Sequence, residues 1–263
     1  MSASELLVTR PQPQADEWVA ALRARGVPAL GLPLIEIEPD ADAAAAAWLA
    51  LDAQRLVVFV SPNGVQSFFA QRPASAHWPA ERWAAATGPG TSRALRAAGV
   101  PSEAILEPSH DAVQFDSEAL WRRLQPMAWR GQRVLVVRGD GGRDWLAERL
   151  RQQGAEVAFV QAYRRSAPRL DGALRTRLDA LRAAPARHAW LFSSSQAVVH
   201  LQQLMPQSSD WSAGCALATH PRIADTLREA GFGAVWSVRP TLDAVVSTWK
   251  RSIQSSSAPD QRP

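Results

Sequence analysis

The chain has 263 residues and a formal net charge of +4, and 46% of its residues are hydrophobic while 21% are charged. This balance is typical of a globular protein large enough for two domains with buried cores, and it excludes a fibre or a disordered tail. The single cysteine, Cys215, excludes an internal disulfide and fits a reducing cytosol.

Neither a membrane nor a nucleic acid is an expected partner. The N-terminus has no basic start followed by an apolar stretch, and the longest apolar run, residues 43–51, is far too short to span a bilayer. Lys250 is the only lysine, and the arginines are dispersed beside acidic residues rather than gathered in a basic stripe. We expect a cytoplasmic protein whose positive charge suits a small polyanion, although a GC-rich genome that replaces lysine with arginine explains the excess equally well.

The first apolar runs predict a β-α-β unit. Residues 6–8 have the length of a strand, and a helical pattern through residues 18–22 ends at Gly26, a typical C-terminal glycine. Residues 29–37 are expected to form the second strand.

The next two strands each lead into a turn rich in proline, glycine or hydroxyl residues. The strand at 56–60 is followed by Ser61-Pro62-Asn63-Gly64, and the strand at 84–86 by Gly88-Pro89-Gly90-Thr91. Both turns precede helical patterns, and a further helix is expected around residues 120–124.

The second half of the chain begins with another β-α-β pattern. The strand at 134–137 leads to Arg138-Gly139-Asp140-Gly141-Gly142, and the helix at 145–150 ends at Gly154. Later strands are expected at 157–163, 190–192 and 216–218. Strands that alternate with helices predict an α/β fold with open, doubly wound parallel sheets.

The two halves of the chain repeat each other in the same order of blocks. Arg10 and Arg138 are separated by 128 positions, and so are Gly26 and Gly154. Residues 59–63 match 192–196 at a separation of 133, and residues 87–99 match 219–231 at 132. Nearly constant spacing over three blocks indicates an internal duplication, and two similar halves imply a cleft between them.

Two polar segments with a proline, residues 36–42 and 164–170, occupy equivalent places after the second strand of each β-α-β unit. If they are paired linkers, one domain consists of residues 1–38 and 169–263 and the other of residues 39–168, with the active site in the cleft between them. Two sequential domains divided near residues 129–132 are the alternative. The serine- and proline-containing tail, residues 252–263, is expected to be disordered.

Ligands of open α/β sheets bind beyond the carboxyl ends of the strands, where helix N-termini present unpaired N–H groups to an anion. The turns at these places are rich in small and hydroxyl residues, as expected for binding carboxylate or phosphate oxygens. Simple capping of the following helices explains each turn taken alone. The sequence has neither a P-loop nor a dinucleotide fingerprint, and its five histidines lack metal-ligand spacing, so we expect no nucleotide and no metal.

The ordered set of motifs resembles the uroporphyrinogen-III synthase family from Leu6 to about Trp249. The chain departs from the common family pattern before Ser61, where threonine is frequent and Val60 stands here. The segments that carry the resemblance are Val8-Thr9-Arg10-Pro11, Phe59-Val60-Ser61-Pro62-Asn63-Gly64-Val65, Gly88-Pro89-Gly90-Thr91, Arg138-Gly139-Asp140-Gly141-Gly142-Arg143, Gly154-Ala155-Glu156-Val157, Tyr163-Arg164-Arg165, Phe192-Ser193-Ser194 and His220-Pro221-Arg222-Ile223.

The resemblance implies two flavodoxin-like domains joined by a two-stranded linker. It also implies the cyclisation of the linear tetrapyrrole hydroxymethylbilane to uroporphyrinogen III in haem biosynthesis, with inversion of ring D, loss of water and no cofactor. Loss of the terminal hydroxyl gives an azafulvene, and ring D attacks through its substituted carbon to form a spiro intermediate that reopens and closes inverted. Without an enzyme the same substrate closes to the uninverted type I isomer.

Tyr163, the only tyrosine, stands at the conserved tyrosine position of the family, and we expect it to assist departure of the hydroxyl. A phenol stays protonated at neutral pH and can donate a hydrogen bond or a proton, whereas the alternative is a linker tyrosine that only packs. The residues expected to bind the substrate carboxylates are Arg10, Ser61, Pro62, Asn63, Gly88, Thr91, Arg138, Gly139, Gly142, Arg143, Ser193, Ser194, Ser195 and His220.

A non-catalytic two-domain module that binds a small polyanion is the alternative function. We expect a monomer whose contact with the preceding enzyme of the pathway, if it exists, is transient.

Overall fold

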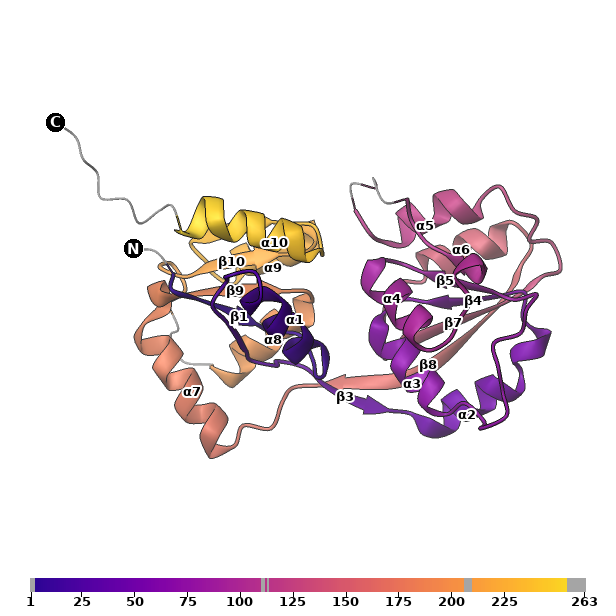
Figure 1. The fold of residues 1–263 in the computed structure, drawn as a ribbon, viewed down its shortest axis with the longest axis horizontal. Coiled ribbons are helices and arrows are strands. Elements are labelled where there is room, and N and C mark those ends of the chain that lie inside the picture. Colours follow the sequence, from indigo (N-terminus) through magenta and orange to yellow (C-terminus); the bar gives the residue numbers. More distant parts are fainter. Residues whose placement is uncertain (1–2, 110–111, 113, 206–209, 255–263) are drawn as a thin grey trace. The chain divides into compact units, whose positions relative to one another are not determined.

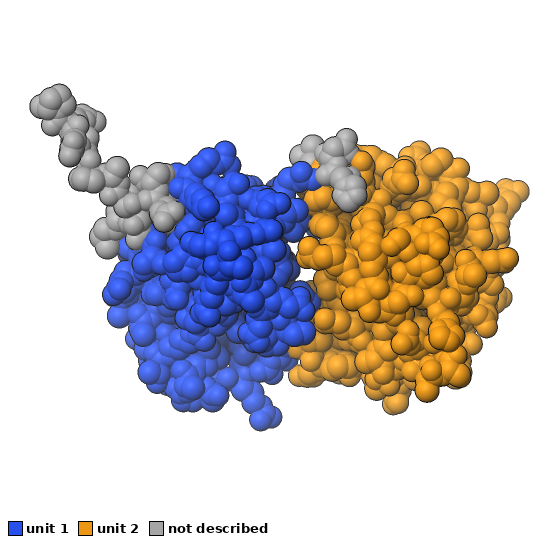
Figure 2. All heavy atoms as spheres, in the orientation of Figure 1, with its two compact units in different colours: residues 1–36, 166–263 blue, residues 37–165 orange. Residues whose placement is uncertain are grey.

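The computed structural model describes residues 3–109, 112, 114–205 and 210–254. The chain divides into two compact units, shown in Figure 2, and each contains its own sheet. Unit 1 consists of residues 1–36 and 166–263, and unit 2 of residues 37–165. The chain therefore passes from one unit to the other twice, and a division near residues 129–132 does not match these units.

Within the described residues, unit 1 contains a five-stranded sheet of order β11-β10-β9-β1-β2, in which every neighbouring pair of strands is parallel. If the strands of the unit are numbered in chain order, their order across the sheet is 2-1-3-4-5, which is the flavodoxin-like order. The strands are β1 (Glu5–Val8), β2 (Ala29–Gly31), β9 (His188–Phe192), β10 (Cys215–Ala218) and β11 (Ala234–Ser237). The helices of the unit are α1 (Gln14–Arg23), α7 (Gly172–Ala183), α8 (Ser195–Leu204), α9 (Pro221–Glu229) and α10 (Leu242–Thr248), with short helical segments at Pro185–Arg187 and Trp249–Gln254.

The described part of unit 2 contains a six-stranded sheet of order β3-β8-β7-β4-β5-β6. Without its edge strand β3, the sheet has the flavodoxin-like order. The chain, however, enters it at the position of the third flavodoxin strand, which β4 occupies, and β7 and β8 take the first two positions. The strands are β3 (Glu36–Pro39), β4 (Leu56–Phe59), β5 (Trp83–Ala86), β6 (Ile105–Leu106), β7 (Arg133–Gly139) and β8 (Glu156–Ser166). The helices are α2 (Ala41–Leu49), α3 (Pro62–Ala70), α4 (Pro89–Ala97), α5 (Ser117–Leu124) and α6 (Trp145–Gln152), with single turns at Leu51–Ala53 and Ser102–Ala104.

Helices cover both faces of the unit 2 sheet, as expected for a parallel sheet. Val57 and Phe59 of β4 pack with α2, α3 and α4, while Leu56 and Val58 of the same strand pack with α5 and α6. All four side chains are buried because alternate residues of a strand point to opposite faces.

The strand registers confirm the internal repeat. Leu6 of β1 pairs with Ala29 of β2, and Val134 of β7, 128 positions later, pairs with Val157 of β8. The next strand pair agrees as well. Leu56 pairs with Trp83 in unit 2. The residues 133 and 132 positions later, Ala189 and Cys215, pair with each other in unit 1. The β-α-β segment that opens unit 1 is thus equivalent to the one that closes unit 2.

Two expectations from the sequence are wrong. Residues 29–37 form two strands in different sheets rather than one, because β2 ends at Gly31 and Pro33 has no N–H to donate to a ladder. Residues 252–254, assigned to a disordered tail, continue a helical segment, and residues 255–263 lie outside the described residues.

Candidate active site

In each unit, the residues expected to bind the substrate lie at the carboxyl edge of the parallel sheet. In unit 2 they follow β4 and β5 or lie at and after the end of β7, and Tyr163 lies on β8. In unit 1 they follow β1, β9 and β10. The sheet order reverses direction between β7 and β4 in unit 2 and between β1 and β9 in unit 1, and such a switch point is where open α/β sheets bind ligands.

Ser61 begins the turn after β4 and caps helix α3. Its backbone is extended, and its Oγ accepts a hydrogen bond of 3.1 Å from the N–H of Gly64. Pro62 occupies the first helical position, where its missing N–H leaves no intrahelical bond unmade. Asn63 is buried in the same turn. Local sequence alone sets this geometry, since serine followed by proline is a strong helix start.

Tyr163 lies beside Ser61 because strand β8 contains a bulge. Arg138 of β7 pairs with Gln161, and the next residue, Gly139, pairs with Tyr163, so Ala162 is the extra residue. The bulge turns the Tyr163 ring to the face that already holds Ala162, which regular alternation would prevent. The Tyr163 hydroxyl then lies 2.8 Å from Ser61 Oγ.

Gly139 makes this position of Tyr163 available. A Cβ atom at residue 139 would lie 2.6 Å from Cε2 and Cζ of the Tyr163 ring and 3.0 Å from its hydroxyl oxygen. No real side chain tolerates such contacts, so the ring lies where only glycine admits it. Tyr163 is 2% exposed, and its ring belongs to the core of unit 2.

Asp140 connects the turn after β7 to the end of β8. Its N–H donates to the carbonyl of Tyr163, and its Oδ1 accepts a 3.0 Å hydrogen bond from the backbone N–H of Arg165. The Arg165 guanidinium lies 3.6 Å from the same carboxylate and 5.6 Å from the centre of the Tyr163 ring. The backbone on both sides of Tyr163 is therefore tied to the Asp140 turn.

The remaining arginines expected in unit 2 are paired with acidic residues. Arg138 pairs with Asp144 and lies 4.1 Å from the centre of the Phe159 ring. Arg143 forms two hydrogen bonds with Glu118, and these raise the pKa of its guanidinium. The charges of Arg138 and Arg143 are thus already compensated by partly exposed carboxylates. Gly142 has a φ of 127°, a backbone conformation that favours glycine. A Cβ atom on it would lie 3.9 Å from the Arg138 guanidinium, so this loop lies close to Arg138.

The turn after β5 places Gly88 and Thr91 at the start of α4. Gly88 caps the helix without a side chain, and a Cβ there would lie 3.1 Å from Phe115. Thr91 is buried, and its N–H donates to the carbonyl of Gly88. A Cβ on Gly90 would lie 3.5 Å from Pro62, so the N-termini of α3 and α4 adjoin.

The edge of unit 1 has equivalent caps. Ser194 Oγ accepts from the N–H of Gln196 at the start of α8, and the His220 ring accepts from the N–H of Arg222 at the start of α9. Thr226 of α9 donates to Ser195 of α8, which links these two helices. Ser193 precedes the first cap, and the Arg10 guanidinium lies 4.2 Å from the Trp18 ring centre.

Comparison with known proteins gives the family of the chain. A family model described as uroporphyrinogen-III synthase HemD matches residues 16–247. The uroporphyrinogen-III synthase of Escherichia coli is 32% identical over 237 residues, which cover 86% of this chain and 92% of the relative. That of Synechococcus elongatus is 32% identical over 271 residues, covering 94% and 95%. This chain belongs to the uroporphyrinogen-III synthase family. Family members are cyclising lyases of tetrapyrrole biosynthesis.

Solved structures of uroporphyrinogen-III synthases share the fold. A mutant of the Thermus thermophilus protein matches with a TM-score of 0.58 and 20% identity. The match covers 96% of this chain and 100% of the Thermus thermophilus chain. The Helicobacter pylori protein matches with a TM-score of 0.59 and 16% identity, covering 92% and 96%. These structures confirm the α/β architecture with parallel sheets that the sequence predicts.

Other features of the described chain do not add to this site. No cluster of three or more histidine, cysteine, aspartate or glutamate side chains there could hold a metal ion. No described helix is long and apolar enough to cross a membrane.

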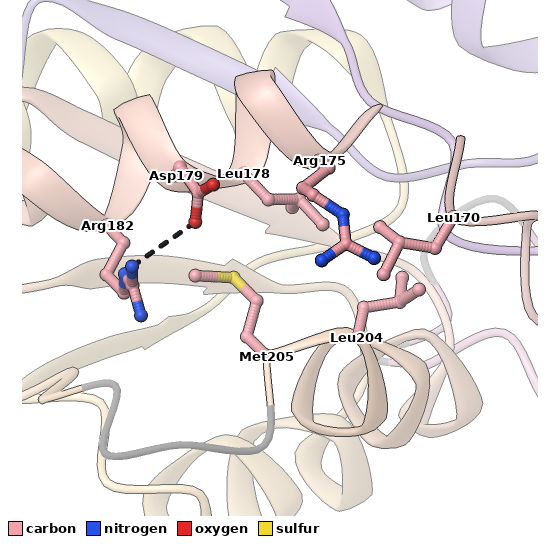
Figure 3. Close-up of a pocket in the computed structure, with 7 residues that line it drawn as sticks. All are labelled: Leu170, Arg175, Leu178, Asp179, Arg182, Leu204 and Met205. Atoms are coloured by element: carbon pink, nitrogen blue, oxygen red, sulfur yellow. Dashed lines mark hydrogen bonds and ion pairs between the residues drawn. The ribbon is translucent and has the colours of Figure 1, made fainter. Parts of the chain in front are cut away.

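A pocket of about 290 Å³ lies elsewhere in unit 1, between α7 and the C-terminal end of α8 (Figure 3). It lies at the end of α8 opposite Ser195, so it is separate from the turns that follow the strands. Its lining is mixed and includes an ion pair between Arg182 and Asp179. The residues that line it are Leu170, Arg175, Leu178, Asp179, Arg182, Leu204 and Met205.

Sequence reasoning missed the residues that support Tyr163. The Asp140–Arg165 contact joins residues 25 positions apart, and each residue type is common in a loop. The bulge at Ala162 left no mark in the hydrophobic pattern. Only the glycine at 139 was a usable signal, because a glycine that ends a buried strand often marks a close approach of another group.

Proposed function

We propose that this chain cyclises hydroxymethylbilane to uroporphyrinogen III and that the carboxyl edges of both sheets bind the substrate. The observation that carries the proposal is the matched set of capped helix N-termini at the two switch points, in a chain of this family. The acetate and propionate groups of the substrate make it polyanionic. Helix N-termini bind such groups through backbone N–H donors and the positive end of the helix dipole.

The state of the arginines supports a binding site built mainly from backbone. Arg138 and Arg143 already pair with Asp144 and Glu118, so a substrate carboxylate would have to share or replace these partners. The turns at Ser61, Gly88, Ser194 and His220 require no such exchange. We therefore assign the main carboxylate contacts to these turns and a supporting role to the arginines.

Tyr163 is the proposed acid for loss of the terminal hydroxyl. Its place on β8, at the switch point of unit 2, and its hydroxyl contact with Ser61 support the assignment. A positioned acid of this kind typically accelerates a proton transfer by ~10²–10⁴-fold. Control of the substrate conformation then decides which carbon of ring D attacks, and hence which isomer forms.

The substrate would bind in a cleft between domains that move about residues 36–42 and 164–170. The two crossings of the chain between the units support this proposal. We also propose a monomer, since the large exposed apolar side chains of the described residues, Leu49, Leu170 and Val199, lie on separate segments. Contact with the preceding enzyme of the pathway would then be transient.

The proposed reaction predicts the isomer of the product. Purified protein mixed with fresh hydroxymethylbilane should give mostly the type III isomer, measured by chromatography after oxidation, because only an enzyme directs ring inversion. Added chelator should leave the ratio unchanged. A ratio equal to that of the enzyme-free control, with the substrate still bound, would instead support the polyanion-binding module.

A further inference from the structure

We propose that Ser61 is the residue that donates a proton to the leaving hydroxyl and that Tyr163 acts through Ser61. The inference rests on the proposed function and refines it: Ser61 contacts the leaving hydroxyl, and Tyr163 supplies its proton through Ser61 rather than directly. It follows from the hydrogen bonds of the two hydroxyls and from their different exposure.

The Ser61 hydroxyl has one hydrogen to donate and two lone pairs to accept with. One lone pair accepts the N–H of Gly64, at 3.1 Å. The 2.8 Å contact with Tyr163 therefore has two arrangements. Either Tyr163 donates to Ser61 and Ser61 donates outward, or Ser61 donates to Tyr163 and Tyr163 donates outward.

Burial selects the first arrangement. Tyr163 is 2% exposed, and its ring and hydroxyl lie against Gly139 within the core of unit 2. Ser61 is partly exposed at the start of α3, on the edge where the ligand is proposed to bind. Ser61 is thus the hydroxyl of the pair that a substrate can reach.

The two bonds that Ser61 accepts increase its acidity. Donation from Gly64 N–H at the positive end of a helix and donation from a phenol both withdraw electron density from Oγ, and successive hydrogen bonds strengthen each other. The bulge at Ala162, the glycine at 139 and the Asp140 turn hold the phenol in place for this purpose.

The proton count of the step is balanced. The C–O bond of the hydroxymethyl group breaks with its electron pair on oxygen, which takes the Ser61 proton and leaves as water. Ser61 takes the proton of Tyr163. Ring closure later releases the proton of the attacked ring, and this proton restores the phenol.

The test combines kinetics with a signal from Tyr163 that does not depend on activity. Because Tyr163 is the only tyrosine, protein labelled with ¹³C at the tyrosine Cζ gives one resonance, which reports whether the phenol donates a hydrogen bond. The variants are Ser61→Ala, Ser61→Thr, Tyr163→Phe and the Ser61→Ala/Tyr163→Phe double variant. Thr241→Ala, which removes the hydroxyl cap of α10, is the matched control for loss of a cap.

We expect Ser61→Ala to lower kcat by about 10²-fold and to shift the tyrosine resonance, and Ser61→Thr to restore both. Thr241→Ala should change neither. The double variant should be no slower than Ser61→Ala, because both residues serve one proton path.

Three results would overturn the inference: an unchanged tyrosine resonance in Ser61→Ala, a kcat for Ser61→Ala near that of the wild type, or losses that multiply in the double variant. If the wild type gives no excess of type III isomer, the proposed function fails. The resonance still shows in that case whether the donor arrangement is correct.

Discussion

The two units have the same strand registers but different groups at the switch point. Unit 2 has Ser61 as the cap, with Tyr163 against it and Gly139 beneath the ring. In unit 1 the cap is again a serine, Ser194, but the residue 128 positions before Tyr163 is the buried Ile35. The residue 128 positions before Gly139 is Pro11. The duplication thus kept the serine helix cap in both units and the hydroxyl pair in one.

This difference suggests a division of labour between the edges. Helix N-termini present backbone N–H groups that suit carboxylates, and both edges have such N-termini. A proton donor is needed at one place only, where the hydroxyl of the substrate leaves. We therefore place the chemistry at unit 2 and give unit 1 the role of binding.

The largest expected effect on kcat comes from adding a side chain at Gly139, a position at which unit 2 differs from unit 1. Gly139→Ala puts a Cβ 2.6 Å from the Tyr163 ring, so the ring has to move away from Ser61. We expect kcat to fall by at least the ~10²-fold of a lost acid, and unfolding in urea to show a loss of about 1–3 kcal/mol.

Gly172→Ala is the matched control for Gly139→Ala. A Cβ at Gly172 contacts nothing within 4 Å, and the residue begins helix α7 of unit 1. This variant should keep wild-type kcat and stability. If Gly139→Ala also keeps wild-type kcat, the position of the Tyr163 ring does not matter for the reaction.

The sequence predicted the parts of this edge that depend on neighbouring residues. Strands β4, β5, β7 and β8 follow from hydrophobic periodicity, the Ser61 cap from serine before proline, and the repeat from spacing, whereas β6 and β11 were not predicted. The contact between Ser61 and Tyr163 joins residues 102 positions apart, and it depends on a bulge that only the pairing of β7 with β8 creates. The break after Gly31 was missed because the apolar residues around Pro33 continue the strand pattern.

A second prediction concerns the cooperation of the two edges. If unit 1 binds carboxylates of the same substrate molecule that reacts at unit 2, binding of a product analogue must restrict the movement of the units relative to each other. Solution X-ray scattering should show a smaller radius of gyration with the analogue than without it. Identical profiles, at an analogue concentration that saturates binding, would contradict a shared site.

The smallest expected effect tests whether changes in unit 2 stay within unit 2. Cys215 of β10 is the only cysteine, and burial raises the pKa of its thiol from 9.0 to about 11. Because the thiolate is the reactive form, alkylation of the folded protein at neutral pH should be slow and should accelerate only as the pH approaches that value. Between pH 9.0 and about 11 the folded state keeps the thiol proton that the unfolded state loses. The thiol's contribution to the free energy of unfolding is therefore complete below pH 9.0 and is lost as the pH rises through the folded pKa. We expect Gly139→Ala to shift the tyrosine resonance of unit 2 while the rate of Cys215 alkylation in unit 1 stays within about twofold of the wild type, since mutations far apart act independently. A large rise in that rate would show that the two units fold as one, and the separate roles assigned to their edges would then need a test in which each edge is changed without the other.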